Sequence, residues 1–184
     1  MSLWKTLSTC PLFYDIHQSE MEKHFINCRV SEYHKGETIY GEEEDINYLF
    51  TVLEGKITIT RKAKEGMKDI QVLSKGGFYG EHFLFSDMKK TEILTVEENT
   101  KILEVPFQIL QEVFEKDPPI YGIFITNLSY LVLKKFEIAQ NIVFRIMEEP
   151  GNTIRVPLYD DTTIRKAYSR DERDKFIKKM TQNK

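Results

Sequence analysis

The pattern of apolar and polar positions predicts β-structure between residues 29 and 106. Ile57 and Ile59 alternate with Thr58 and Thr60, which places the two residue types on opposite faces of an extended chain. Similar short stretches, rich in β-branched and aromatic residues, recur along this part of the sequence. The predicted strands are ETIY (37–40), YLFTVLE (48–54), EGKITITRK (54–62), KDIQVLS (68–74), EILTVEE (92–98) and KILEVP (101–106).

Glycine residues divide these predicted strands. Glycine is favoured where the backbone needs positive φ or where two backbone segments approach closely, so it marks turns. Short, evenly spaced strands separated by such turns are typical of an antiparallel roll or barrel. The glycines in question are Gly36, Gly41, Gly55, Gly66, Gly76, Gly77 and Gly80.

Helical periodicity flanks the predicted roll on both sides. Residues 12–28 predict a short helical lead with Ile16, Met21, His24 and Phe25 facing inward. After Pro106 the apolar residues recur at intervals of three and four, which predicts an amphipathic helix that ends near Asp117 and the two following prolines. The fold class that we expect is α+β.

A second, longer helix is predicted from about Ile120 to Glu149. About 30 helical residues span about 45 Å, which is too long for so small a roll to cover. Part of its apolar surface therefore needs another chain, and we expect a homodimer. The predicted interface residues follow a spacing of 4, 3, 4 and 3: Val132, Phe136, Ala139, Val143 and Ile146.

Length and composition limit the class of protein. A chain of 184 residues allows one main domain and an appendage. No stretch reaches the roughly 18–20 apolar residues of a membrane span, and the N-terminus has no signal-peptide pattern, so we expect a soluble cytoplasmic protein. Two cysteines, Cys10 and Cys28, are too few for a disulfide framework, an iron–sulfur cluster or a structural zinc site.

The net charge of −3 conceals an asymmetry. Residues 162–184 hold eight basic and three acidic side chains, a balance of +5, so the rest of the chain carries −8. A basic end on an acidic body suits contact with a phosphate backbone, although a solvated tail would have the same composition.

The order of roll, glycine-acid turn, helix and long helix resembles the effector half of the bacterial Crp/Fnr transcription factors, which has a cyclic-nucleotide-binding-type fold. The resemblance covers residues 8–147 and implies an antiparallel β-roll of the double-stranded β-helix or jelly-roll type, with flanking helices. The matching stretches are CPLF (10–13), YHKGETIY (33–40), YLFTVLEGKITI (48–59), GGFYGEHFLF (76–85) and ILEVP (102–106).

The resemblance implies that the turn after the glycine pair is a phosphate-binding cassette, a short helix whose N–H groups face a cyclic phosphate. Glu81 matches the glutamate that accepts from the ribose 2′-hydroxyl, and Lys90 falls where the family has its phosphate-pairing arginine. The effector-binding candidates are Gly80, Glu81, His82, Phe83, Lys90, Thr91 and Gln140.

Departures from the family pattern disfavour a cyclic nucleotide. Lys90 offers a point charge in place of a two-pronged guanidinium, and Glu92 adds a carboxylate beside the anion site. Gln140 is the only polar candidate for contacting the base. A different small effector, or none, is expected, and no cofactor is assigned. Haem would need axial ligands, and the four histidines (His17, His24, His34 and His82) are scattered over different segments.

The C-terminal segment resembles a reduced helix-turn-helix without a wing. Asp160 or Asp161 would cap the first helix, and Ser169 the second. Arg170, Asp171 and Lys175 would face bases, whereas Arg173, Lys178 and Lys179 would be available to phosphates. The predicted DNA-binding residues are Ser169, Arg170, Asp171, Arg173, Lys175, Lys178 and Lys179. The segment could equally be vestigial.

Together these patterns predict a transcriptional regulator with three parts: a sensor domain (1–118), a dimerisation helix (119–149) and a DNA-binding segment (150–184). Its expected partners are a second copy, DNA and a small effector, with no membrane. The alternative is a stand-alone sensor or protein-interaction module of the same fold without DNA binding. The sequence has none of the common catalytic motifs, so we expect no enzyme, no catalytic residue and no metal ligand.

Overall fold

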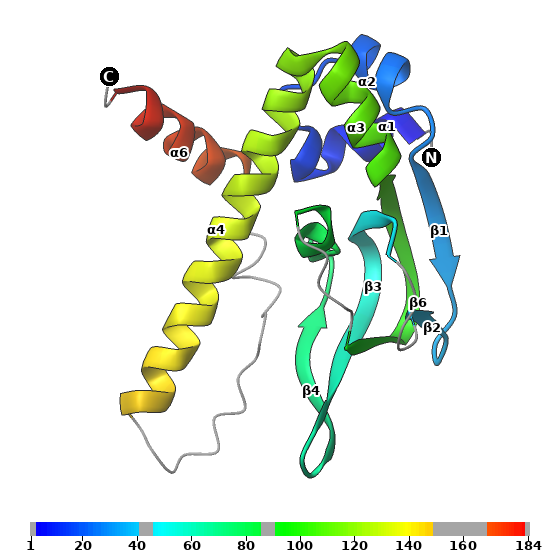
Figure 1. Ribbon diagram of the computed structural model, residues 1–184, viewed down its shortest axis with the longest axis vertical. Helices are drawn as coiled ribbons and strands as arrows, with labels where there is room; N and C mark the ends of the chain where they lie inside the picture. The colour runs from blue at the N-terminus through cyan, green and yellow to red at the C-terminus, as the bar shows by residue number, and fades with distance from the viewer. Residues whose placement is uncertain (1–2, 41–45, 86–90, 149–168, 183–184) are drawn as a thin grey trace.

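The computed structural model describes residues 3–40, 46–85, 91–148 and 169–182, with side chains up to Lys179. Its described strands form one six-stranded antiparallel sheet, which has the β-roll topology that the sequence predicts (Figure 1). The path β1-β6-β3-β4 is extended by β2, which pairs with β6, and by β5, which pairs with β3. The strands are β1 (Arg29–Tyr33), β2 (Thr38–Tyr40), β3 (Tyr48–Ala63), β4 (Gly66–Leu73), β5 (Phe78–Tyr79) and β6 (Glu92–Pro106).

Two pairs of predicted strands are each one continuous strand, so the sequence-based division was wrong there. Residues 48–54 and 54–62 form β3, and residues 92–98 and 101–106 form β6. Gly55 lies within β3 at φ 91°, and a Cβ added to it would lie 2.3 Å from the Thr100 hydroxyl oxygen. The register shifts on both sides of Gly55. This glycine therefore bends the strand at a bulge instead of ending it.

The interior of the roll is apolar. Alternation along β3 places Ile57 and Ile59 in this core, as the sequence predicts. Phe50 packs against Tyr40 and Tyr79, with ring centroids 6.3 Å and 5.9 Å apart. These contacts hold the short strands β2 and β5 against the central strand β3.

Helices cover one end of the sheet and enclose a second core. Phe13, Phe25 and Phe124 are buried there, with ring centroids 5.0–5.9 Å apart. Burial of each ring contributes about 1.5–3 kcal/mol, so this cluster fixes the N-terminal lead to the long helix. The helices are α1 (Leu3–Thr9), the 3-10 turn η1 (Pro11–Phe13), α2 (Gln18–His24), α3 (Phe107–Lys116) and α4 (Pro118–Glu148).

The N-terminal lead is less regular than the sequence suggests. A single helical segment over 12–28 was expected, but η1 ends at Phe13 and α2 begins only at Gln18. Between them Asp15 adopts φ 63°. The four expected inward positions are nevertheless confirmed, since Ile16, Met21 and Phe25 are buried and the His24 side chain is 6% exposed. The left-handed residue turns the chain so that both short helices reach the same core.

The long helix α4 begins at the two prolines instead of after them. A proline in the first turn of a helix gives up no intrahelical hydrogen bond, and its fixed φ suits this position. The first half of α4 buries Phe124, Leu128 and Leu131. Its second half extends away from the other helices that cover the end of the sheet (Figure 1). Among the described residues, no helix is long and apolar enough to cross a membrane.

A further helix, α6 (Arg170–Gln182), lies against α4 on the side opposite the sheet (Figure 1). Phe176 of α6 contacts Tyr130 of α4, with ring centroids 5.3 Å apart. The predicted first helix of the C-terminal segment and its candidate caps Asp160 and Asp161 lie outside the described residues.

Candidate functional site

The cassette is built on Gly80. This residue adopts φ 99° and precedes a 3-10 turn, η2, that spans Glu81–Leu84. A Cβ at position 80 would lie 2.7 Å from the Tyr48 carbonyl oxygen, so both the backbone angle and the close approach to β3 require glycine. The predicted cassette residues Gly80, Glu81, His82 and Phe83 therefore lie together on one turn at the end of β5.

Glu81 is paired inside the protein. The Lys135 ammonium group, from α4, donates a hydrogen bond of 2.6 Å to Glu81 Oε1. Lys135 also lies 4.6 Å from the centroid of the Phe78 ring and 3.4 Å from the Phe78 carbonyl oxygen. The Glu81 side chain is 11% exposed, and its Oε2 has no hydrogen-bond partner among the described residues. One carboxylate oxygen is thus paired with α4, and the other is buried without a hydrogen-bond partner among the described residues.

Lys135 contacts the cassette from α4, and sequence reasoning did not single it out. We expected the helix contact at Gln140, which is exposed five residues further along α4. The adjacent lysines Lys134 and Lys135 interrupt an apolar run, and that interruption was the available signal. It could not show which lysine faces the roll: Lys134 pairs with Glu137 at 2.9 Å, and Lys135 reaches Glu81.

Aromatic rings line the cassette beside Glu81. The rings of His82 and Phe83 lie 4.0 Å apart, and Tyr79 contacts His82 edge to face at 5.2 Å. Burial lowers the pKa of His82, and the Lys135 charge lowers it further, against the opposing charges of Glu81 and Glu92. Burial, with the charges of Glu92 and Glu81, raises the pKa of Tyr79.

The strand side of the cassette adds negative charge. Thr91 is exposed, and its N–H donates to Glu92 Oε2 at 3.1 Å. Glu92 is close enough to Tyr79 to affect its pKa, so this carboxylate is not turned away from the cassette. Lys90, the candidate phosphate partner, lies outside the described residues. Among the described residues around Tyr79, the carboxylates of Glu81 and Glu92 stand beside one ammonium group, that of Lys135.

Residues 30–117 match the family described as the cyclic nucleotide-binding domain. This part of the chain is a cyclic nucleotide-binding domain. A search of curated protein sequences found no significant match. Domains of this type are mostly regulatory and not enzymatic.

Several solved structures share the fold of the domain and its helices. A cyclic nucleotide-binding domain from Methylobacillus flagellatus is 15% identical and aligns over 83% of this chain and 85% of its own, with a TM-score of 0.67. The N-terminal domain of a transcriptional regulator from Streptomyces coelicolor is 21% identical over 70% of this chain and 92% of its own, with a TM-score of 0.58. The Thermus thermophilus catabolite activator protein is 16% identical over 94% and 87%, with a TM-score of 0.60.

The two thiols and the four histidines lie in different surroundings. Cys10 and Cys28 are both buried, and burial raises the pKa of Cys10 to about 12, so its reactive thiolate is scarce. Of the four haem-ligand candidates, His17 precedes α2, His24 ends it, His34 follows β1 and His82 lies in the cassette. His17 and His24 thus bound one helix, and the other two histidines lie on different elements.

The helix that leaves the cyclic nucleotide-binding domain has an exposed apolar stripe. Phe136 is 58% exposed, Val143 55% and Ile146 49%. Val132 and Ala139, the other predicted interface residues, are also exposed. Leu133, Phe144 and Met147 add exposed apolar surface on the same helix. This surface is far more apolar than a lone helix in water normally shows.

The C-terminal helix α6 is fixed to the rest of the molecule by arginines that we expected to contact DNA. Arg173 is 6% exposed and donates to Asn127 Oδ1 at 2.9 Å and to Asp15. Arg170 donates to Asp15 at 2.7 Å and lies over the Tyr14 ring. Arg173 is therefore unavailable to phosphates in this arrangement.

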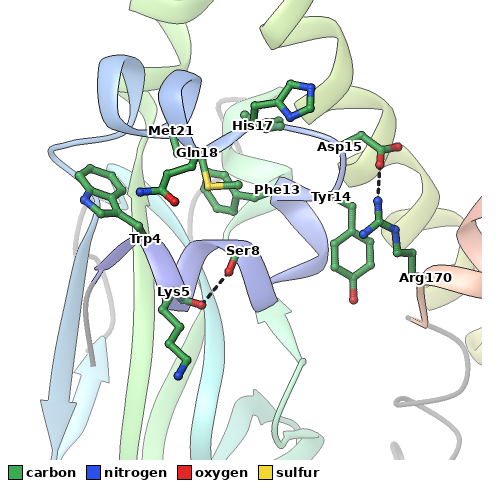
Figure 2. Close-up of a pocket in the computed structure, with 11 residues that line it drawn as sticks. Trp4, Lys5, Ser8, Phe13, Tyr14, Asp15, His17, Gln18, Met21 and Arg170 are labelled. Carbon is green, nitrogen blue, oxygen red and sulfur yellow. Dashed lines mark hydrogen bonds and ion pairs between the residues drawn. The ribbon is translucent and has the colours of Figure 1, made fainter.

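The remaining predicted DNA-binding residues lie on the outer side of α6 or at its start. The Ser169 hydroxyl accepts from the Glu172 N–H at 3.4 Å, so Ser169 caps the helix as predicted. Asp171, Lys175, Lys178 and Lys179 are exposed. Arg170 and Asp15 also line a pocket of about 690 Å³ between α1, α2 and the start of α6 (Figure 2).

Proposed function

We propose that this protein is a Crp/Fnr-type transcriptional regulator, a homodimer in which the cyclic nucleotide-binding domain senses a ligand or a state. The observation that carries the proposal is the apolar stripe on α4, where Phe136, Val143 and Ile146 are about half exposed. A second copy packed along α4 would bury this surface. The three parts would be the sensor (1–118), the dimerisation helix (119–149) and the DNA-binding segment (150–184).

DNA contact is supported by charge and by order along the chain. Residues 162–184 carry +5 on an otherwise acidic protein. The alignment with the Thermus thermophilus catabolite activator protein extends over 94% of this chain, which is further than the sensor domain alone. Lys175, Lys178 and Lys179 are exposed on α6 and suit contact with phosphates.

The effector is not expected to be a cyclic nucleotide. Lys135 already neutralises Glu81 from within, and Glu92 adds negative charge beside Tyr79 of the cassette. Calorimetry with cyclic AMP and cyclic GMP should detect no binding at micromolar concentrations. If the unmodified protein binds a cyclic nucleotide, and the Glu81→Ala and Lys90→Ala variants each lose that binding, the cyclic nucleotide is the effector after all.

Fluorescence anisotropy with duplex fragments drawn from promoter regions tests DNA binding. Affinity should fall with added salt. The slope of log affinity against log salt should decrease in the Lys178→Gln, Lys179→Gln double variant, by about one for each of the two lysines that binds a phosphate in the unmodified protein.

The matched control for this experiment is Lys35→Gln, Lys75→Gln, which removes two exposed charges from the roll. Its salt dependence should equal that of the unmodified protein. An affinity that ignores salt and both pairs of substitutions would remove the electrostatic basis of the proposal. No detectable binding to duplex DNA would favour the alternative, a sensor module that acts without DNA. The burial of Arg173 is the observation that supports this alternative.

A further inference from the structure

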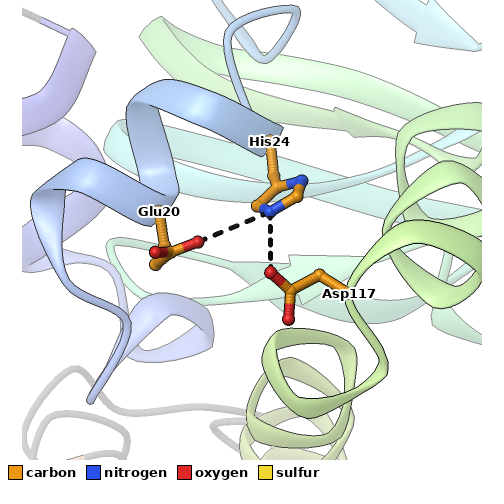
Figure 3. A group of neighbouring side chains, drawn as sticks. All are labelled: Glu20, His24 and Asp117. Atoms are coloured by element: carbon orange, nitrogen blue, oxygen red, sulfur yellow. Dashed lines mark hydrogen bonds and ion pairs between the residues drawn. The ribbon is translucent and has the colours of Figure 1, made fainter.

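Glu20, His24 and Asp117 form a cluster that the cassette does not use (Figure 3). Glu20 and His24 are four residues apart on α2, so they lie on one face of that helix. Asp117 joins α3 to α4, 93 positions after His24. Each residue offers one donor atom, and the three atoms lie within 4.8 Å of one another.

We propose that this cluster binds a divalent transition-metal ion such as Zn²⁺. His24 Nε2 lies 3.1 Å from Asp117 Oδ2 and 3.4 Å from Glu20 Oε2. Two ligands on a tetrahedral zinc ion, with bonds of about 2.0–2.1 Å, are separated by about 3.3 Å. His24 Nε2 therefore already has the separation from each carboxylate oxygen that an ion between them requires. One imidazole and two carboxylates suit Zn²⁺, Mn²⁺ or Fe²⁺ and leave positions open for water.

The individual donors are held for this role. The side chains of His24, Asp117 and Glu20 are 6%, 21% and 30% exposed. Glu20 Oε2 is buried and has no hydrogen-bond partner among the described residues. The two carboxylate oxygens of Asp117 have different contacts. Oδ1 accepts from the Ile120 N–H at 3.4 Å and caps α4, whereas Oδ2 faces His24. Oδ2 can therefore ligate without loss of the helix cap.

The charge of the cluster favours an ion. The two carboxylates face one ammonium group, Lys23, which lies 3.4 Å from Asp117 Oδ2 and 3.8 Å from Glu20 Oε2. The Lys23 side chain is 61% exposed, so it can swing into solvent when a metal enters. A bound ion would tie α2 to the first turn of α4 and so link the N-terminal lead to the dimerisation helix.

The test uses the full chain, stripped with a chelator and titrated with ZnCl₂. We expect one zinc ion per chain after dialysis, by elemental analysis, and a rise in melting temperature as zinc is added. His24→Gln and Asp117→Asn should each weaken binding at least tenfold. Asn keeps the capping oxygen, so the second variant should fold normally. Lys23→Gln removes the competing cation and should tighten binding.

The matched control is His34→Gln, which removes an exposed histidine that also faces a glutamate, Glu37, at 3.7 Å. It should bind zinc as tightly as the unmodified protein. The proposal is overturned if the stripped protein takes up no stoichiometric zinc at micromolar concentration, or if His24→Gln and Asp117→Asn bind as the unmodified protein does. The cluster would then be an ion-pair network only. Neither readout involves DNA, so this result is independent of the proposed function.

Discussion

Arg173 donates a hydrogen bond of 2.9 Å to the buried Asn127, 46 positions earlier in the chain. The Asn127 side-chain amide donates in turn to the carbonyl oxygens of Leu12 and Tyr14. One asparagine of α4 therefore connects the C-terminal helix to the N-terminal lead. If α6 contacts DNA as proposed, Arg173 must either leave this network or remain in it while the lysines bind.

The ion pairs of Asp15 should make the attachment of α6 depend on pH. Although burial opposes the shift, Arg173 and Arg170 lower the pKa of Asp15 below its ordinary 3.8. A lowered carboxyl pKa stabilises the folded protein above the unfolded-state value, and that stability is lost as the pH falls through the folded value. Urea denaturation of Asp15→Asn should thus give lower stability than the unmodified protein at pH 6, and the difference should shrink below pH 4. Asn tolerates the φ of 63° found here. A difference that stays constant with pH would contradict this interpretation.

The Lys135–Glu81 ion pair should stabilise the folded protein more than the Lys134–Glu137 pair on α4 does. Lys135→Gln leaves a carboxylate that is 11% exposed without its cation, so we expect a loss of about 1–3 kcal/mol of unfolding free energy. Lys134→Gln breaks a pair with Glu137, which is 58% exposed, and should cost less than about 0.5 kcal/mol. Chemical denaturation measures both. Equal losses would mean that Lys135 does not hold the cassette.

Gly80→Ala should disrupt the cassette more than the same change at Gly36. Both glycines have positive φ, 99° and 89°, and a left-handed alanine costs roughly 1–2 kcal/mol. At Gly80 the new Cβ would also collide with the Tyr48 carbonyl oxygen, whereas nothing lies within 4 Å at Gly36. Thermal unfolding should therefore show at least twice the loss for Gly80→Ala. Similar losses would show that the backbone of β3 can move aside.

Replacement of Phe136 and Val143 by aspartate should yield monomers. Both side chains are more than half exposed in the single chain, so the substitutions leave the described core untouched. The two aspartate charges would lie at the centre of the apolar stripe and would be buried without partners when two copies associate. Light scattering at a fixed concentration measures the mass. The control is Phe114→Asp, a substitution at an exposed residue of α3 outside the apolar stripe of α4. This variant should remain dimeric. An unchanged mass in the double variant would refute the α4 interface.

The sequence by itself determined the β-region between residues 29 and 106, the glycine turn of the cassette and the length of α4, because these follow from local periodicity and from backbone angles that only glycine adopts easily. It did not separate the short strands β1 and β5, which carry too few residues for a periodic signal. It could not determine which residues of α4 face the roll, because that depends on how the helix crosses the sheet, and so Lys135 was not singled out. Only the tertiary structure brought Arg173 to Asn127 and Asp117 to His24. Contacts between residues 46 and 93 positions apart leave no periodic signal, since they arise from the packing of whole helices.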